Sequence, residues 1–266
     1  MTDHELDVDT ASRATAPGTR EGEVTDRWNT PNGTPNGGYL LALALRGLAE
    51  EVDAPHPLVA AMTYLRPARP GPVTLEQSVL RAGRRVSTAR STTLQDGQAV
   101  THLVASFGDR DADVGPDVEL GSPPDLPPPA ECRDPGLAAL AGPNGPMTIA
   151  DRADYRLASP PGWAQGTPTG DPTQEYWVRL SDGRPVDRLA LAFLVDAWPP
   201  AVADLGHLAA VTVQLTVHLH REPTTAWVAC RVTTRHVVGG YHEEDMEIWD
   251  EAGRLCAQSR QLALMV

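Results

Sequence analysis

The alternation of apolar and polar positions predicts a helix followed by several strands, and it predicts this order twice. In the first half, the apolar run Leu40–Val52 follows turn residues, so we expect a helix that is capped by Asn36 and buried on most sides. Strand-like segments separated by Gly- and Pro-containing hairpin signals come next. They lie at 58–65, 72–81, 86–94 and 99–107.

The second half repeats this order after a strand-like segment at 175–180. A helical run at 186–197 precedes further strand-like segments at 209–220, 226–235, 241–249 and 254–264. A recurring order of elements indicates an internal duplication. We therefore expect an α+β chain in which a helix and a four-stranded antiparallel meander are formed twice.

Composition divides the chain further. Residues 1–22 are polar and acidic without periodicity, which predicts a disordered leader. Residues 110–172 hold roughly half of the 25 prolines and few periodic runs, which predicts a linker. The two folded units are therefore expected at 23–109 and 173–266.

Charge and cysteine content exclude several classes of protein. The formal net charge of −13 argues against a nucleic-acid partner, because phosphate contacts need clustered cations. No stretch approaches the roughly 20 apolar residues of a membrane helix, and the start of the chain lacks a signal-peptide core, so we expect a cytoplasmic protein with no membrane partner. The three cysteines are widely spaced and the eight histidines form no metal signature, so neither a disulfide framework nor a metal site is expected.

Asp196 is an isolated carboxylate in the apolar run Leu189–Trp198. Burial is costly for a charge, and Pro199-Pro200 places Asp196 near the C-terminal end of the predicted helix, where the helix dipole also disfavours a negative side chain. Both effects raise the pKa of a carboxyl toward neutrality, which is the range of a general base. The alternative is an Asp at a helix end that reaches solvent or a backbone donor.

Short motifs in a consistent order resemble one known family. The chain carries Asn36-Gly-Gly-Tyr39, Leu65-Arg-Pro67, Leu194-Val-Asp196, His220-Arg221 at the end of the strand with Thr212, and Ala257-Gln-Ser-Arg-Gln261. Over residues 23–108 and 174–266 this order resembles the double-hotdog acyl-CoA thioesterases of the bacterial thioesterase II type. The resemblance implies two antiparallel sheets in one chain, each wrapped around a long buried helix.

The resemblance also implies a reaction and its residues. Such a protein hydrolyses acyl-CoA or acyl-carrier-protein thioesters in lipid metabolism, needs no cofactor, and can form a homo-oligomer. Members of the family bind the attacking water with an Asp, a Thr and a Gln from the second half, which by position are Asp196, Thr212 and Gln261. Asp196 accepts the proton of the water, while Thr212 and Gln261 fix its direction.

Thioester hydrolysis also requires hydrogen-bond donors for the oxyanion, and Gly37 and Gly38 are the candidates for this role. Glycines let a ligand approach the N–H groups in the first turn of a helix, where the dipole favours negative charge. We therefore expect both residues to bind substrate and stabilise the oxyanion. A flexible Asn-Gly turn is the alternative interpretation.

Two of these assignments have rivals on the same strands. Thr216 shares a strand face with Thr212 by alternation, whereas the odd spacing of Gln258 places it on the face opposite to Gln261. Two other functions are compatible with the fold, a non-catalytic acyl-thioester binding module and a double-hotdog enoyl-CoA hydratase or dehydratase. The Asp-x4-His motif of those hydratases is absent from this sequence.

Overall fold

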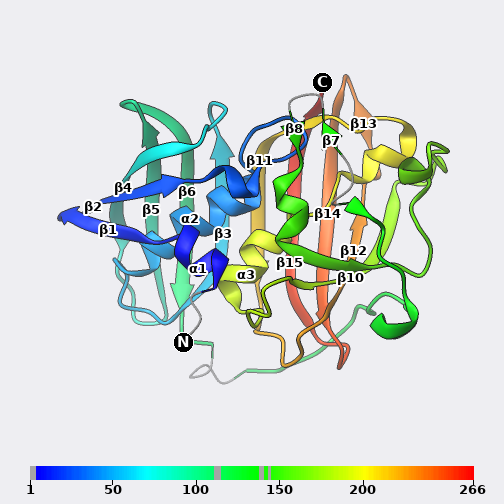
Figure 1. Cartoon of the computed structure of the whole chain (residues 1–266). Coiled ribbons are helices and arrows are strands. Elements are labelled where there is room, and N and C mark those ends of the chain that lie inside the picture. Colours follow the sequence, from blue (N-terminus) through cyan, green and yellow to red (C-terminus); the bar gives the residue numbers. More distant parts are fainter. Residues whose placement is uncertain (1–3, 111–114, 138–140, 143–144) are drawn as a thin grey trace.

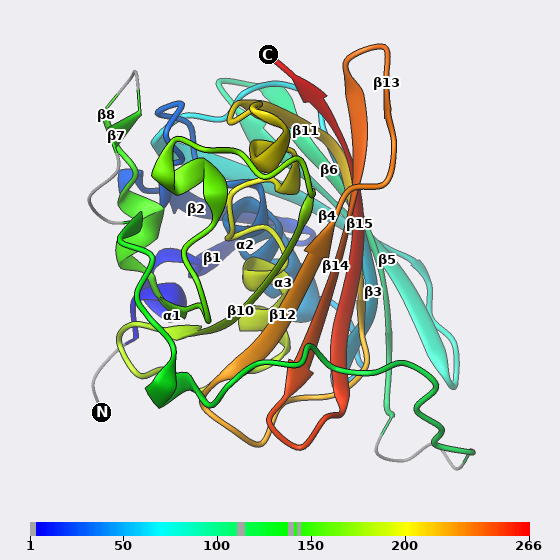
Figure 2. The ribbon, with the colours of Figure 1, turned by 90° about the vertical axis from the view of Figure 1, so that its right-hand side faces the viewer.

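The computed structural model describes residues 4–110, 115–137, 141–142 and 145–266, and one antiparallel sheet of 13 strands dominates it. Its two longer helices lie side by side on the same face of the sheet, which curves around them (Figures 1 and 2). The first half contains α1 (Glu5–Asp9), β1 (Ser12–Ala16), β2 (Thr19–Val24), α2 (Gly37–Ala49), β3 (His56–Tyr64), β4 (Gly71–Arg81), β5 (Val86–Gln95) and β6 (Gln98–Gly108). The second half contains β9 (Ala153–Arg156), β10 (Thr173–Leu180), α3 (Arg188–Leu194), β11 (Ala210–Leu219), β12 (Val228–Thr233), β13 (Val237–Val238), β14 (Tyr241–Asp250) and β15 (Leu255–Met265).

The strands of the two halves follow the same spatial order on either side of a central junction. Outward from this junction, the first half runs β3-β6-β5-β4-β2-β1 and the second half runs β11-β15-β14-β12-β10-β9. In each half the helix lies between the second and third strands of this set in chain order. This matched order supports the internal duplication that the sequence predicts.

The expectation of two sheets is wrong, because β3 pairs with β11 and joins the halves into one sheet. The paired residues run from Val59 opposite His218 to Thr63 opposite Gln214. Without this pairing, both strands would present a row of unpaired backbone groups at an edge. The four strands after each helix are also not a simple meander, since β3 pairs with β6 and not with β4.

The second helix is shorter than its sequence pattern predicts. Of the expected helix at 186–197, only the seven residues Arg188–Leu194 are helical. The helix begins there because Asp187 caps it, accepting a hydrogen bond from the Ala190 N–H at 2.8 Å. It ends before Pro199-Pro200, whose rings cannot continue a helix. The prediction of a long buried helix is therefore wrong for this half.

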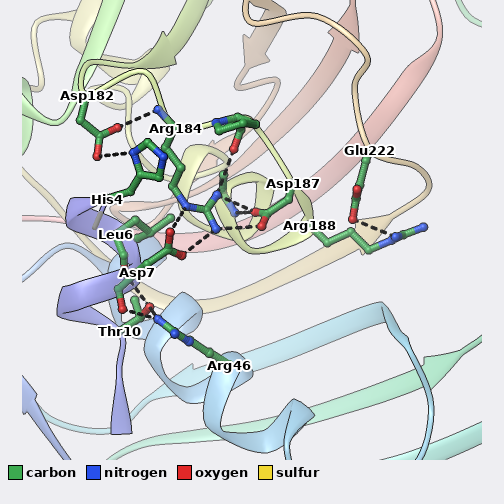
Figure 3. Close-up of polar contacts among 12 residues, drawn as sticks. His4, Leu6, Asp7, Thr10, Arg46, Asp182, Arg184, Asp187, Arg188 and Glu222 are labelled. Carbon is green, nitrogen blue, oxygen red and sulfur yellow. Dashed lines mark hydrogen bonds and ion pairs between the residues drawn. The ribbon is translucent and has the colours of Figure 1, made fainter. Parts of the chain in front are cut away.

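The predicted disordered leader is instead α1 and a hairpin of β1 and β2 in the residues described. Strand β2 pairs with β4 and so occupies the position that β10 has in the second half. Figure 3 shows how α1 contacts α2 and the loop before α3: Asp7 accepts two hydrogen bonds from Arg184 of that loop, at 2.8 and 3.0 Å, and its backbone carbonyl accepts one from Arg46 of α2. Composition could not predict that this segment is ordered, because its polar groups form hydrogen bonds with residues far away in the sequence.

The Pro-rich segment expected as a linker also supplies part of the second half. Strand β9 extends the sheet beyond β10, and short 3-10 helices form at Thr148–Asp151 and Gly162–Gln165. Three of its apolar side chains, Ile149, Tyr155 and Trp163, are buried in the core. The second unit therefore begins before residue 173.

Helix α2 confirms the predicted cap and burial. The Asn36 side chain accepts a hydrogen bond from the Tyr39 N–H at 2.9 Å, and nearly every residue from Gly38 to Leu48 is buried. At its first turn α2 meets the last turn of α3 closely enough to exclude a side chain. A Cβ atom at Gly38 would lie 2.4 Å from the backbone carbonyl oxygen of Phe193.

We predict that Gly38→Ala lowers the free energy of unfolding by about 1–3 kcal/mol, because an extra methyl group in this packed contact forces the two helices apart. Chemical denaturation measures the change. Gly115→Ala is the matched control, since a Cβ there meets no atom within 4 Å, and it should change the stability by less than about 0.5 kcal/mol. Equal effects of the two substitutions would contradict the close contact.

Candidate active site

Asp196 follows α3 in the chain but lies against the start of α2. Its Oδ2 accepts hydrogen bonds from the Gly38 N–H at 2.9 Å and from the Asn36 amide at 3.1 Å. The same Asn36 amide donates to the Asp196 backbone carbonyl at 2.7 Å. The carboxylate is therefore held by residues 158 and 160 positions earlier in the sequence.

The electrostatic setting of Asp196 differs from the one that the sequence predicts. The carboxylate does follow the C-terminal end of α3, but it faces the N-terminus of α2, whose dipole favours negative charge. Burial raises the pKa of Asp196 to about 6, while hydrogen bonds from Gly38, Gln261, Asn36 and Gly37 oppose this rise. The pKa lies in the range of a general base because removal from water outweighs four donors.

Gln261 and Thr212 lie together on the inner face of the sheet, on neighbouring strands. The Thr212 hydroxyl donates to Gln261 Oε1 at 2.8 Å, and the Gln261 amide is among the donors that lower the pKa of Asp196. Thr212 and Gln261 are thus joined by a hydrogen bond, and Gln261 lies close enough to Asp196 to lower the pKa of its carboxyl.

A β-bulge decides between Thr212 and Thr216. Pairing between β11 and β15 shifts between Thr212 and Gln214, so the alternation of faces changes at that point. Thr212 therefore points inward to Gln261, while Thr216 lies on the outer face and accepts a hydrogen bond from Gln214 at 2.6 Å. Simple alternation wrongly placed both threonines on one face.

The rival Gln258 lies on the outer face, as its odd spacing from Gln261 predicts. Its Oε1 contacts His220 Nε2 at 3.2 Å. It also lines a shallow outer hollow together with Thr216 and His218. Within the part of the chain that the structure describes, no three His, Cys, Asp or Glu side chains are grouped to hold a metal ion.

Gly37 and Gly38 lie where substrate donors were predicted, but their N–H groups face Asp196. A Cβ atom at Gly37 would lie 2.7 Å from Asp196 Oδ2 and 2.9 Å from the Tyr64 hydroxyl. The Gly38 N–H donates to Asp196, and the Gly37 N–H also lowers the pKa of that carboxyl. Both glycines are therefore needed for the close approach of the carboxylate to the helix.

Three residues of the site were not identified as such from the sequence. Asn36 was recognised only as a cap, yet its amide binds Asp196. The Tyr64 hydroxyl donates to the Gly37 carbonyl at 2.9 Å, and burial together with the nearby charge of Asp196 raises its pKa. Glu244 accepts a hydrogen bond from the Gln261 amide at 2.7 Å. A signal for Glu244 exists, since it shares a strand face with the apolar Met246 and Ile248 and so occupies a core position.

Comparison with known proteins agrees with this fold. Among solved structures, the chain is similar to a protein from Thermobifida fusca described as a thioesterase II, with 30% identity, a TM-score of 0.86, and coverage of 100% of this chain and 99% of that one. It is similar to a hot dog fold protein from Alicyclobacillus acidocaldarius, with 26% identity, a TM-score of 0.86, and coverage of 99% and 98%. An uncharacterized protein from Mycobacterium tuberculosis is 26% identical over 267 residues, which cover 92% of this chain and 90% of that protein.

The sheet and its enclosed helices therefore define a protein of the hotdog class. Residues 24–108 match the acyl-CoA thioesterase N-terminal domain, and residues 123–265 match the acyl-CoA thioesterase C-terminal domain. The chain belongs to the acyl-CoA thioesterase family and is a thioester hydrolase. None of the described helices is long and apolar enough to cross a membrane.

We predict that Asp196→Asn raises the thermal midpoint of unfolding at pH 8 by a few degrees. A carboxyl with a raised pKa binds its proton more tightly in the folded state, so it costs stability as pH rises from the unfolded value of about 3.9 toward the folded value of about 6. The gain should be small near pH 4, where the folded wild-type carboxyl is protonated and the unfolded one is about half protonated. Differential scanning calorimetry from pH 4 to 8 measures this, with the exposed Asp125→Asn as control. A lower midpoint for Asp196→Asn at pH 8 would be the contrary result.

Proposed function

We propose that this chain hydrolyses acyl-CoA thioesters by attack of a water molecule that Asp196 activates. The observation that carries the proposal is the meeting of Asp196 with the start of α2 and with the Gln261 amide. A base near neutral pH, polar groups for a water and a helix N-terminus are then within one site. Acyl-CoA substrates place the reaction in lipid metabolism, whereas a cytoplasmic location and a homo-oligomer stay predictions from the sequence.

The proposed reaction transfers one proton to Asp196 and returns it to the leaving group. Asp196 takes a proton from water while the water oxygen bonds to the thioester carbonyl carbon, which forms a tetrahedral oxyanion. Collapse of the oxyanion breaks the carbon–sulfur bond, and the thiolate takes the proton from Asp196. The products are a carboxylic acid and a free thiol. The Thr212 hydroxyl, which donates to Gln261, keeps lone pairs that can accept a hydrogen bond from the water.

We assign the oxyanion to the start of α2, where the N–H groups of Gly37 and Gly38 face Asp196 in the resting enzyme. As the proton moves to Asp196, negative charge leaves the carboxylate and appears on the substrate oxygen. The helix N-terminus can therefore stabilise whichever oxygen is charged, without rearrangement of the backbone. This assignment keeps the predicted role of the two glycines and explains why they face the base.

We further propose that the architecture is a double hotdog, two fused units of one helix and its strands. The matched strand order on either side of the β3–β11 junction supports this description. The shortness of α3 is the departure from two equal units. A hydratase of the same fold and a binding module without turnover are the competing functions, and assays of hydration of crotonyl-CoA and of thiol release distinguish them.

We predict that Asp196→Asn lowers kcat for acyl-CoA hydrolysis by about 10²–10⁴-fold, because it removes the proton acceptor and keeps the shape of the side chain. Release of free thiol from a panel of acyl-CoAs measures turnover, and isothermal titration with a thioether analogue checks that binding is retained. The exposed Asp125→Asn should match the wild type. Turnover of Asp196→Asn within about threefold of the wild type would exclude the general-base role.

We also predict one active site per chain, although the fold is duplicated. The corresponding start of α3 follows Pro185, which has no N–H, and the carboxylates that follow α2, Glu50 and Glu51, form ion pairs with Arg20. Titration with the thioether analogue should give one equivalent per chain. Two equivalents per chain, or hydrolysis by an isolated half, would contradict this division between the halves.

A further inference from the structure

Glu244 is a buried carboxyl on the inner face of β14, directly opposite Gln261 of β15 in the sheet register. Only 5% of Glu244 is exposed, and 6% of Gln261. Each carboxyl oxygen of Glu244 accepts one hydrogen bond. Oε1 accepts from the Gln261 amide at 2.7 Å, and Oε2 accepts from the backbone N–H of Ala201 at 2.6 Å.

These contacts allow only one orientation of the Gln261 amide. An ionised carboxylate accepts hydrogen bonds and donates none, so the nitrogen of Gln261 must face Glu244. Gln261 Oε1 then faces Thr212, whose hydroxyl donates to it at 2.8 Å. A reversed amide would place its oxygen against the carboxylate, and the second hydrogen of its nitrogen would no longer point to the catalytic side.

We propose that Glu244 is a positioning residue for thioester hydrolysis, which holds the Gln261 amide so that its nitrogen serves both Glu244 and Asp196. The inference rests on the proposed role of Asp196 as the base. In addition to Asp196, the reaction then uses a second carboxyl, that of Glu244, which contacts neither water nor substrate and acts by orienting Gln261. Hydrogen bonds join the Ala201 N–H to Glu244 and Glu244 to the Gln261 amide, which in turn lowers the pKa of Asp196.

The charge state of Glu244 follows from its surroundings. Burial raises its pKa to about 7, and the hydrogen bonds from Ala201 and Gln261 oppose this effect. The titratable groups that face it are Asp196 after α3 and Tyr176 of β10, and the charge of the outward-facing Asp245 on its own strand also raises its pKa. The charge of Asp196 also raises the pKa of Glu244, so both carboxyls are ionised together only above neutral pH.

Replacement of Glu244 by Gln separates its charge from its shape. The backbone N–H of Ala201 cannot turn, so the new side chain must keep its oxygen toward Ala201 and turn its amide nitrogen toward Gln261. Two amide nitrogens would then face each other unless Gln261 reverses. The variant Glu244→Gln therefore turns the Gln261 amide without removing any side-chain atom from the core.

The test compares Glu244→Gln with Glu247→Gln, Gln261→Ala and the double variant Glu244→Gln/Gln261→Ala. Glu247 lies on the same strand, faces outward and pairs with Arg231, so its variant should match the wild type. We expect Glu244→Gln to lower kcat by about 10–100-fold with KM within about twofold, as for other groups that orient a catalytic residue. In the Gln261→Ala background, Glu244→Gln should lower kcat no further.

The pH profile supplies a second readout, because the proposal needs two ionised carboxyls. In the wild type, the acid limb of log kcat/KM against pH should have a slope above one, and in Glu244→Gln the slope should fall to one. Retention of kcat within about threefold, an unchanged slope, or effects of Glu244→Gln and Gln261→Ala that multiply in the double variant would each overturn the proposal. A structural role alone would lower the unfolding midpoint and leave the slope unchanged.

The side-chain amide resonances of Gln261 test the orientation without any turnover. In wild-type protein they should shift between pH 8 and pH 5 as Glu244 takes a proton, and in Glu244→Gln, where that variant folds, they should differ from the wild type already at pH 8. Resonances that are the same at both pH values in the wild type and resemble an exposed glutamine would overturn the proposal. If wild-type protein releases no thiol or Asp196→Asn retains turnover, the proposed function fails, and these resonances still decide whether Glu244 orients Gln261.

Discussion

The close contact between the first turn of α2 and the last turn of α3 is the constraint on which the site depends. It exists because Gly38 carries no side chain where the Phe193 carbonyl approaches. The same contact brings Asp196, just beyond α3, to the N–H groups at the start of α2. One steric requirement thus joins the two halves of the chain and places a carboxylate at a positive helix end. Gln261 is held in the sheet beside this contact, since β15 pairs with β11 along nearly its whole length.

Among the residues that the structure describes, those that contact the two carboxylates of the site hold their negative charge with dipoles instead of with a cation. Asp196 is stabilised by backbone N–H groups and two side-chain amides, and Glu244 by one backbone N–H and the amide of Gln261. An arginine beside Asp196 or Glu244 would lower the pKa of that carboxyl far below neutrality and weaken it as a base. Neutral donors offset only part of the rise in pKa that burial causes. The pKa values of Asp196 and Glu244 therefore both lie near neutrality. This partial compensation is the physical basis of the proposed proton transfer.

The sequence predicted the elements better than their arrangement. The Asn36 cap, the buried α2 and the burial of Asp196 among apolar residues follow from local composition, and each is present in the structure. The pairing of β3 with β11 depends on two distant strands, so no local pattern could reveal it. The inward turn of Thr212 depends on a bulge, which shifts alternation by one residue and leaves no mark in composition. The early segment was expected to be disordered because its polar residues gave no sign of partners such as Arg184.

The separation of Asn36 and Asp196 by 160 residues has a consequence for how the enzyme becomes active in the cell. During synthesis, the first half emerges and can pair β3 through β6 long before the ribosome has made α3. Its α2 then presents a bare helix start and an exposed strand edge at β3, which are features that invite association with other chains. When the second half docks, it covers both the start of α2 and the edge of β3. Contacts so distant in sequence cannot form before the second half is made, so the proposed site is completed only when the two halves dock.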